Sequence, residues 1–136
     1  MFKYSVVTNE RTVRTGEANA IIAMTESGEI TILKGHIPLL SALKPGVVTV
    51  NTEGDEDFFS VSTGFIEVRQ NGEVVLLADT AEHSDELDLQ VIEKAKNDAR
   101  RIMEEKRHID DEAFAHAAAA LERELAKEKV ARKKKH

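Results

Sequence analysis

The sequence predicts an α+β fold in which an N-terminal antiparallel β-sandwich is followed by a C-terminal antiparallel hairpin of two helices. Up to residue 83, apolar and polar residues alternate, and turn residues recur at intervals of about ten positions. After residue 83, apolar residues recur instead at spacings of three or four. We therefore expect a sandwich domain over residues 1–83 and a helical hairpin domain over residues 84–136.

The strand signals in the first half are of two kinds. Residues 17–23, 29–33 and 65–69 alternate between apolar and polar, whereas residues 47–50 and 74–77 are continuously apolar. Short strands separated by glycine-containing turns are typical of a sandwich or barrel. The dipeptide Asn71-Gly72, between two of these strands, predicts a hairpin closed by a type I′ turn.

Residues 28–46 combine a strand, two turns and a single histidine. We expect Ile30, Ile32 and Leu40 to face the interior of the sheet. His36 lies in the glycine- and proline-containing loop that follows the strand. It is either a loop residue satisfied by backbone hydrogen bonds or a residue that contacts a partner protein.

The first helix is expected to begin at Asp85, with Asp88 three residues later as in a capping box. Its apolar stripe is expected to comprise Leu87, Val91, Ala95, Ala99, Ile102 and Met103. Residues 108–111 break the pattern, and either Asp110 or Asp111 can cap a second helix.

The second helix carries a narrow stripe of small apolar side chains, namely Phe114, Ala117, Ala118, Leu121 and Leu125. Because alanine buries few methylene groups, such a hairpin offsets little of the entropy lost when it becomes ordered. We expect it to fold only against the sandwich or against another protein. A detachable arm and a fixed lid on the sandwich both satisfy this pattern.

Charge is unevenly distributed along the chain. The net charge is −6, and residues 1–83 carry twelve acidic and six basic residues, whereas residues 84–136 carry thirteen of each. The isoelectric point near 5.4 argues against binding to nucleic acid. Without cysteine there is neither a disulfide nor a thiolate metal site. No apolar run approaches the ~20 residues that span a bilayer, so we expect no membrane insertion.

The residue types needed for catalysis do not come together in the sequence. There is no glycine-rich phosphate loop, and His83, His108 and His116 are too scattered for a metal site. We therefore expect no catalytic residue, metal or cofactor. The acidic residues 55–57 follow a glycine and are expected to form a solvated turn.

Basic residues are concentrated at the C-terminus, where residues 123–136 hold seven Lys or Arg and two Glu. The run 132–136 is either a solvated helix end, favoured by the helix dipole, or part of a stripe that meets an acidic surface. Arg123 and Lys127 share one face of the predicted helix and extend that stripe.

Three segments, residues 28–46, 61–68 and 76–82, occur in the order and spacing that resemble the epsilon subunit of F-type ATP synthases, called delta in mitochondria. The resemblance implies a ten-stranded sandwich with a two-helix hairpin. It further implies a non-catalytic subunit of the central stalk, bound to the gamma subunit and the c-subunit ring. Such a subunit couples proton- or sodium-driven rotation to the catalytic alpha/beta head and regulates ATP hydrolysis through its C-terminal helices.

The same resemblance implies roles for particular residues. Glu29 matches the loop that faces the c ring, and His36 matches the segment next to gamma. The basic residues that would face an acidic segment of the catalytic head are Arg123, Lys127, Arg132 and Lys133. The start of the chain fits neither a secretory signal nor a transit peptide, which favours a peripheral position on the cytoplasmic face of a bacterial membrane.

One motif of the family is incomplete. Many bacterial members bind ATP through Ile/Leu-Asp-x-x-Arg-Ala at the start of the first helix. Here Leu87 and Asp88 match, but Val91 and Ile92 replace the arginine and alanine. Without a guanidinium to pair with phosphate, only Asp88 remains as a nucleotide-binding candidate, and we expect weak or no ATP binding.

A different class of function also fits this architecture, namely a free-standing nucleotide-sensing or adaptor module with a β-sandwich body. Co-purification with a gamma-like stalk subunit distinguishes the two interpretations.

Overall fold

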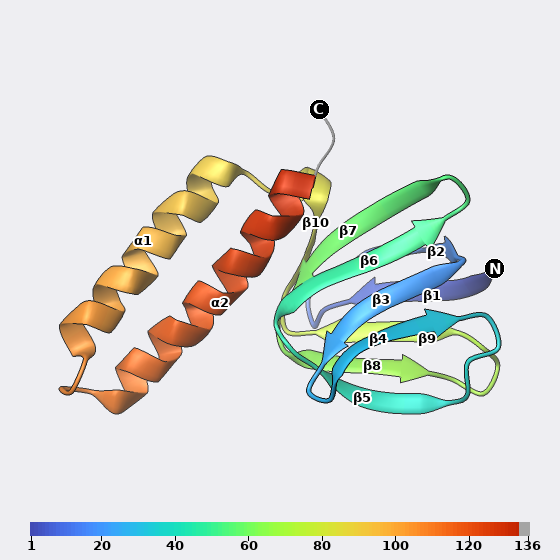
Figure 1. Cartoon of the computed structure of the whole chain (residues 1–136), viewed down its shortest axis with the longest axis horizontal. Helices are drawn as coiled ribbons and strands as arrows, with labels where there is room; N and C mark the ends of the chain where they lie inside the picture. The colour runs from blue at the N-terminus through green and yellow to red at the C-terminus, as the bar shows by residue number, and fades with distance from the viewer. Residues whose placement is uncertain (134–136) are drawn as a thin grey trace.

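The computed structural model describes residues 1–133, which form ten strands, a short 3-10 helix and two α-helices (Figure 1). The strands are β1 (Phe2–Val7), β2 (Thr12–Ala18), β3 (Ala20–Thr25), β4 (Gly28–Leu33), β5 (Leu39–Leu43), β6 (Gly46–Thr52), β7 (Asp55–Val61), β8 (Gly64–Val68), β9 (Val74–Ala78) and β10 (Ala81–His83). The helices are η1 (Ser84–Glu86), α1 (Leu89–Lys106) and α2 (Asp111–Lys133). The predicted fold class is confirmed. Lys134, Lys135 and His136 of the basic tail lie outside the described residues.

The strands form a folded-over sheet in the order β10-β7-β6-β3-β5-β8-β9-β1-β2, with β4 paired to β3. Its two ends meet where the Arg11 guanidinium, just before β2, donates to the carbonyl of Ala81 in β10 at 3.4 Å. Within residues 1–133 every strand pair is antiparallel except β1 and β9, which run parallel. Strand direction is set by the route of the connecting chain, and a parallel pair needs a long connection, which separates β1 from β9 here.

The interior of the sandwich is filled by apolar side chains from all ten described strands. The largest fully buried ones are Phe59, Ile21, Ile32, Leu43, Ile66 and Leu76. Ile32 thus faces the interior as expected, and Ile30 packs against the core, but Leu40 is 68% exposed. Successive residues of a strand point to opposite faces, so only one of the adjacent pair Leu39 and Leu40 can face inward. Leu39 takes that position.

The turn between β8 and β9 forms where it was expected but has a different geometry. The N–H of Gly72 donates to the carbonyl of Arg69 at 3.0 Å, and Gly72 has a φ of 89°. The N–H of Arg69 donates to the carbonyl of Glu73, which closes a three-residue loop. A type I′ turn would also need positive φ at Asn71, and among non-glycine residues 1–133 only His108 has it. The Asn71 side chain instead accepts from the N–H of Glu73 at 3.0 Å.

The first helix begins later than expected. Asp88, rather than Asp85, is its N-cap, and the Asp88 carboxylate accepts from the N–H of Gln90 at 2.8 Å. The preceding residues form η1 instead, capped by His83. The expected apolar stripe is confirmed in part, because Leu87 and Ala99 are buried whereas Ile102 is exposed. Between them Ile92, which is 3% exposed, takes the inward position expected for Val91, which is 65% exposed.

The second helix begins at the aspartate pair, where Oδ1 of Asp110 accepts from the N–H of Ala113 at 3.0 Å. Of its expected stripe, Ala117 is buried, Phe114, Ala118 and Leu121 are half-buried, and Leu125 is exposed. The chain turns between the helices at His108, whose φ is 63°.

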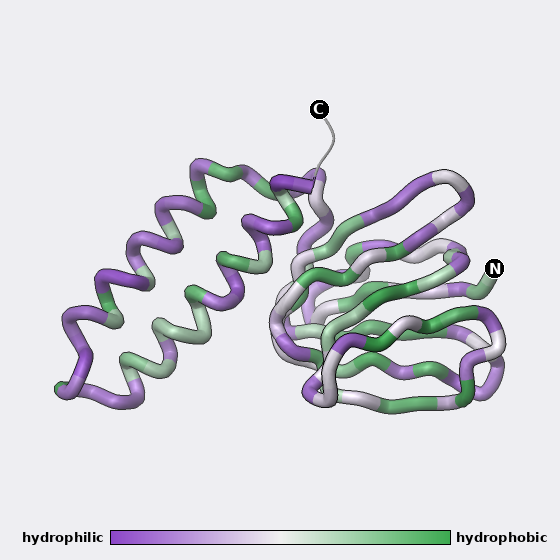
Figure 2. Tube along the Cα trace, in the orientation of Figure 1, coloured by the Kyte–Doolittle hydropathy of each residue, from purple (hydrophilic) through white to green (hydrophobic). Residues whose placement is uncertain are grey.

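The hairpin touches the sandwich near the C-terminal end of α2 and projects away from it (Figure 1). A small apolar cluster holds it there, made by Leu87, Ile92, Val130 and Ala131 with Val47 and Phe58. Figure 2 shows that the rest of the hairpin is mostly purple and pale green, with isolated strongly hydrophobic positions, because small and charged residues predominate. None of the helices in the described part of the chain is long and apolar enough to cross a membrane.

Candidate interaction sites

The outer face of strands β5, β8 and β9 carries apolar side chains that no part of the described chain covers. Phe65 is 53% exposed and lies in register with Ala42 on one side and Leu77 on the other. Leu40 lies on the same face two residues before Ala42. Together Leu40, Phe65 and Leu77 form an exposed row, which we call the apolar face. Sequence periodicity missed it, because strand alternation does not distinguish an inner apolar face from an outer one.

His36 lies in the loop that enters β5, beside this face. Its Nδ1 is 2.7 Å from the carbonyl oxygen of Ile37, and its side chain is half-buried. The loop borders an open depression of about 830 Å³, which is also lined by Lys3, Lys34 and Ile37. Both expectations for His36 are thus compatible with its position: a backbone contact satisfies one ring nitrogen, and the loop remains accessible to a partner.

Glu29 lies near the opposite end of β4 from His36. It is exposed and pairs across the hairpin with Met24, directly after the turn at Gly28. The Thr25 hydroxyl stabilises this turn by donating to the carbonyl of Gly28 at 2.7 Å, and Gly28 has a φ of 116°. The structure therefore does not bring Glu29 and His36 together, and any partners that they contact approach different ends of the sandwich.

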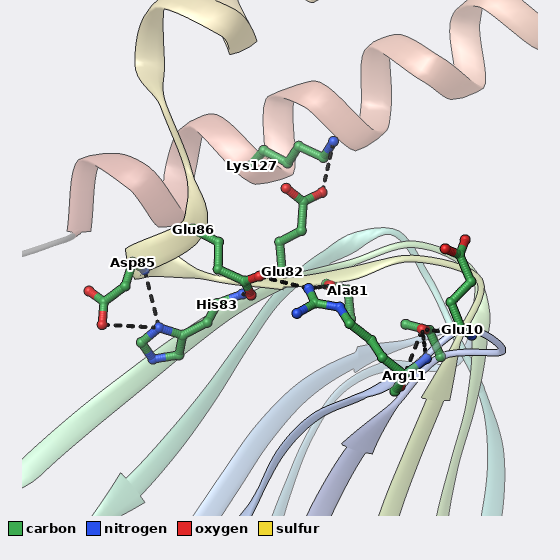
Figure 3. A network of polar contacts seen from close by, with 9 residues as sticks. Glu10, Arg11, Ala81, Glu82, His83, Asp85, Glu86 and Lys127 are labelled. Carbon is green, nitrogen blue, oxygen red and sulfur yellow. Dashed lines mark hydrogen bonds and ion pairs between the residues drawn. The ribbon is translucent and has the colours of Figure 1, made fainter.

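The basic side chains of α2 are largely engaged with other groups of the same chain. Nζ of Lys127 lies 2.9 Å from Glu82 of β10 (Figure 3). It also lies 3.2 Å from Glu124. Burial alone would lower the pKa of Lys127, but the two carboxylates outweigh it and raise the pKa above its usual value. Lys127 therefore stabilises the contact between α2 and the sandwich.

The other three predicted cations differ in their surroundings. Arg132 contacts Glu128 one turn earlier at 3.2 Å, and Nζ of Lys133 lies 5.1 Å from the centroid of the Phe58 ring. Arg123 is half-buried, and none of the ion pairs among residues 1–133 involves it. The four residues share one helix but do not form one continuous charged site.

A buried ion pair that the sequence did not reveal connects the two helices. Nζ of Lys96, a residue that is 7% exposed, lies 2.9 Å from Glu128 of α2 and 3.1 Å from Glu93. The hydrogen bond to Glu128, with a further one to Glu93, raises the pKa of Lys96. The hydrogen bond from Lys96 correspondingly lowers the pKa of Glu128. The spacing of Lys96 along α1 places it on the buried side of the helix. This spacing is the sequence feature that could have identified the ion pair.

A polar network surrounds the point where the sandwich ends and η1 begins (Figure 3). Arg11 pairs with Glu86 at 2.8 Å, and the main-chain N–H of His83 donates to the same carboxylate at 2.9 Å. Burial alone would raise the pKa of Glu86, but these two contacts lower it. The His83 ring contacts Asp57, which also pairs with Arg14 at 3.3 Å. The expectation that residues 55–57 form a solvated turn is therefore wrong in part: all three lie in β7, where Asp55 and Glu56 are exposed and Asp57 is half-buried.

The nucleotide-binding candidate Asp88 serves a structural purpose in the hairpin. Its carboxylate is the N-cap of α1, and the next helical turn presents exposed Val91 instead of a cation. Within residues 1–133, no group of three or more histidine or acidic side chains is arranged to hold a metal ion.

Comparison with known proteins gives consistent matches. Residues 1–84 match the family described as ATP synthase, Delta/Epsilon chain, beta-sandwich domain. The chain is 40% identical over 121 residues to the ATP synthase epsilon chain of Chromohalobacter salexigens, covering 88% of this chain and 84% of that one. It is 41% identical over 99 residues to the epsilon chain of Desulforudis audaxviator, covering 73% and 72% of the two chains.

Solved structures show the same architecture. A chain in the OSCP/F1/c-ring structure of the Euglena gracilis mitochondrial ATP synthase superposes with a TM-score of 0.79 at 25% identity, covering 94% of this chain and 79% of that one. A chain in the central stalk and c-ring structure of the Tetrahymena thermophila enzyme gives a TM-score of 0.59 at 14% identity, with 96% of each chain covered. The second match concerns the fold alone.

Proposed function

The chain belongs to the ATP synthase delta/epsilon family, and from this premise we propose that its apolar face binds the gamma subunit while its hairpin regulates ATP hydrolysis. It is a central-stalk subunit of an F-type ATP synthase. We propose further that it has no catalytic activity of its own, and that it lies peripherally on the cytoplasmic face of a bacterial membrane. No observation favours the free-standing nucleotide-sensing or adaptor module.

The observation that supports the gamma contact is the row of Leu40, Phe65 and Leu77 on an otherwise folded and filled sandwich. Fully burying one such side chain contributes ~1.5–3 kcal/mol, so covering three half-exposed ones contributes several kcal/mol to association. Neighbouring exposed apolar residues on one face are typical of a protein–protein contact. The adjacent His36 loop gives this contact a polar border.

We assign the c-ring contact to the turn that carries Glu29. The turn is exposed and its conformation is fixed by Thr25 and Gly28, so the carboxylate is presented by a defined loop. It lies at the other end of β4 from the His36 loop. The Glu29 turn and the His36 loop can therefore contact the c ring and gamma at the same time.

Regulation is assigned to the cations of α2. In the arrangement described here Lys127 is bound to Glu82, so the hairpin must leave the sandwich before Lys127 can contact an acidic segment of the catalytic head. The small apolar cluster and the largely alanine-lined interior of the hairpin favour such a release, since few methylene groups hold the helices in place.

The gamma contact is tested by a matched pair of variants. Phe65→Ser should weaken binding of the purified protein to a gamma-containing stalk complex by at least about tenfold, since ~1.4 kcal/mol is tenfold in affinity. Val91→Ser removes an apolar side chain of similar exposure from α1 and should leave binding unchanged. Equal affinity of both variants would reject the apolar face as the gamma-binding surface.

A further inference from the structure

His83 is a buried histidine at the junction between the sandwich and the helical hairpin, and the proposed function gives it no role. It is the last residue of β10, its side chain is 8% exposed, and its ring packs edge-on to Phe59 with 5.1 Å between centroids. Its two ring nitrogens contact different elements, Asp57 in β7 and Asp85 in η1. The ring thus connects the first residues beyond the sandwich to the sandwich itself.

The hydrogen bonds identify which ring nitrogen carries the proton. The main-chain N–H of Asp85 donates to Nδ1 across 3.1 Å, and because an amide N–H cannot accept, Nδ1 must be unprotonated. Nε2 therefore carries the hydrogen and donates to Oδ1 of Asp57 at 3.0 Å. The neutral Nε2–H tautomer satisfies both ring nitrogens and acts as the N-cap of η1.

A second proton would have to bind at Nδ1, where the Asp85 N–H already points. Two donors would then face each other, and the cap on η1 would be lost. The Asp85 carboxylate is the nearest alternative acceptor, with Oδ2 at 3.4 Å from Nδ1. That side chain is 73% exposed, so water competes for it, and the distance is long for a charge-assisted bond.

Charged groups surround the ring on several elements. They are Asp55, Glu56 and Asp57 of β7, Asp85 and Glu86 of η1, Arg14 of β2 with Arg11 just before it, and Lys133 of α2. Arg14 already pairs with Asp57, and Arg11 with Glu86, so these two carboxylates are partly neutralised, whereas the Asp85 carboxylate contacts the ring itself. A polar cavity of about 320 Å³, lined by His83, Asp57 and Lys133 among others, gives water access to this point.

We propose that protonation of His83 weakens the attachment of the helical hairpin to the sandwich. As a neutral imidazole it caps η1 and fixes the start of the hairpin. Proton uptake at Nδ1 on acidification removes the cap and increases opening of η1 and of the helices that follow. This inference concerns how the hairpin is attached, and it holds or fails independently of where the hairpin binds in the assembled enzyme.

The isolated full-length protein is sufficient for the test. Nitrogen-15 spectra of the histidine rings at pH 8 should show His83 as the Nε2–H tautomer. Amide hydrogen exchange, corrected for the intrinsic pH dependence, should give protection factors for residues 85–87 that are about tenfold lower at pH 5 than at pH 8, as expected when an N-cap is lost. Protection of α2 should fall in parallel, while β8 and β9 keep theirs.

Two variants isolate the ring. His83→Gln keeps a donor and an acceptor but takes up no proton in this range, so its protection factors should be equal at pH 5 and pH 8. His36→Gln, at the other end of the sandwich, should respond to pH as the wild type does. An undiminished pH response in His83→Gln would overturn the proposal, as would an Nδ1–H tautomer in the wild type.

A rise in protection on acidification would also overturn it, because the Asp85 carboxylate would then hold the charged ring more firmly than the amide holds the neutral one. Should His83→Gln fail to fold, the wild-type protein alone decides. The midpoint of the His83 ring titration and the midpoint of the exchange change must coincide, and a separation of more than about one pH unit would refute the link.

Discussion

Val130 is the most completely buried side chain of the apolar cluster that attaches the hairpin to the sandwich. It is fully buried near the C-terminal end of α2, in the cluster with Leu87 and Ile92 of the hairpin and Phe58 of the sandwich. Val130→Ala removes two methyl groups, each worth ~0.8 kcal/mol of burial, and leaves a small cavity. We expect the substitution to cost about 1.5–2 kcal/mol and to favour hairpin opening by about ten- to thirtyfold.

Hydrogen exchange on the isolated protein measures this opening. Protection factors of amides in α2 should fall by that factor in Val130→Ala, whereas those in β8 and β9 should stay within about twofold, because the sandwich retains its own core. Leu125→Ala, on the same helix but 36% exposed, should change them much less.

The result that would refute this reasoning is a parallel loss of protection in the sandwich and the hairpin. The two would then unfold as one cooperative unit, and the proposed division between residues 1–83 and the hairpin would not exist. An unchanged α2 in Val130→Ala would instead show that ion pairs, and not this apolar cluster, hold the hairpin in place.

The remaining predictions concern ATP binding, the regulation of ATP hydrolysis and the pH dependence of hairpin protection. Calorimetry with millimolar Mg-ATP should show weak or no binding, and a dissociation constant in the low micromolar range would show that other groups replace the arginine missing at Val91. Deleting residues 123–136 should raise ATP hydrolysis by the assembled enzyme without preventing assembly, and Lys127→Glu should do so in part; unchanged hydrolysis would reject the regulatory role. The lowered pKa of Glu128 means that its pairing with Lys96 is fully present above the unfolded value of about 4.3 and is lost as pH falls through the folded value. Hairpin protection in His83→Gln should therefore stay constant down to about pH 5 and fall only below the ordinary pKa of the Glu128 carboxylate, whereas an earlier fall would assign the pH response to other groups.

Most of the architecture followed from local patterns. Alternation over residues 1–83 and a helical period after them are properties of neighbouring residues, so they identify strands and helices without knowledge of the fold. The choice between adjacent apolar residues does not follow in the same way. Leu39 or Leu40, and Val91 or Ile92, could each face inward, and the choice depends on where distant elements lie.

The contacts between distant residues were the least predictable part of the candidate sites. Asp57 and His83 are 26 positions apart, and Lys96 and Glu128 are 32 apart, so no spacing rule connects them. Each looks like an ordinary polar residue until the sheet and the hairpin place it against its partner. Glu29 and His36 were recognised through resemblance, and the strand predicted over residues 29–33 already placed them at its two ends.

The parallel pairing of β1 with β9 has a consequence for the order in which the chain can fold during synthesis. Tyr4 aligns with Val74 across this pair. The N-terminal strand therefore cannot form the pair until the ribosome has added a residue 70 positions later in the chain. Until then β1 can pair only with β2, and the hydrogen-bonding edge that β9 will occupy stays open to other strands. Closure of the sandwich is therefore a late, long-range event, which is characteristic of slowly folding β-proteins. The hairpin is translated only afterwards, when the surface that receives Val130 can already exist.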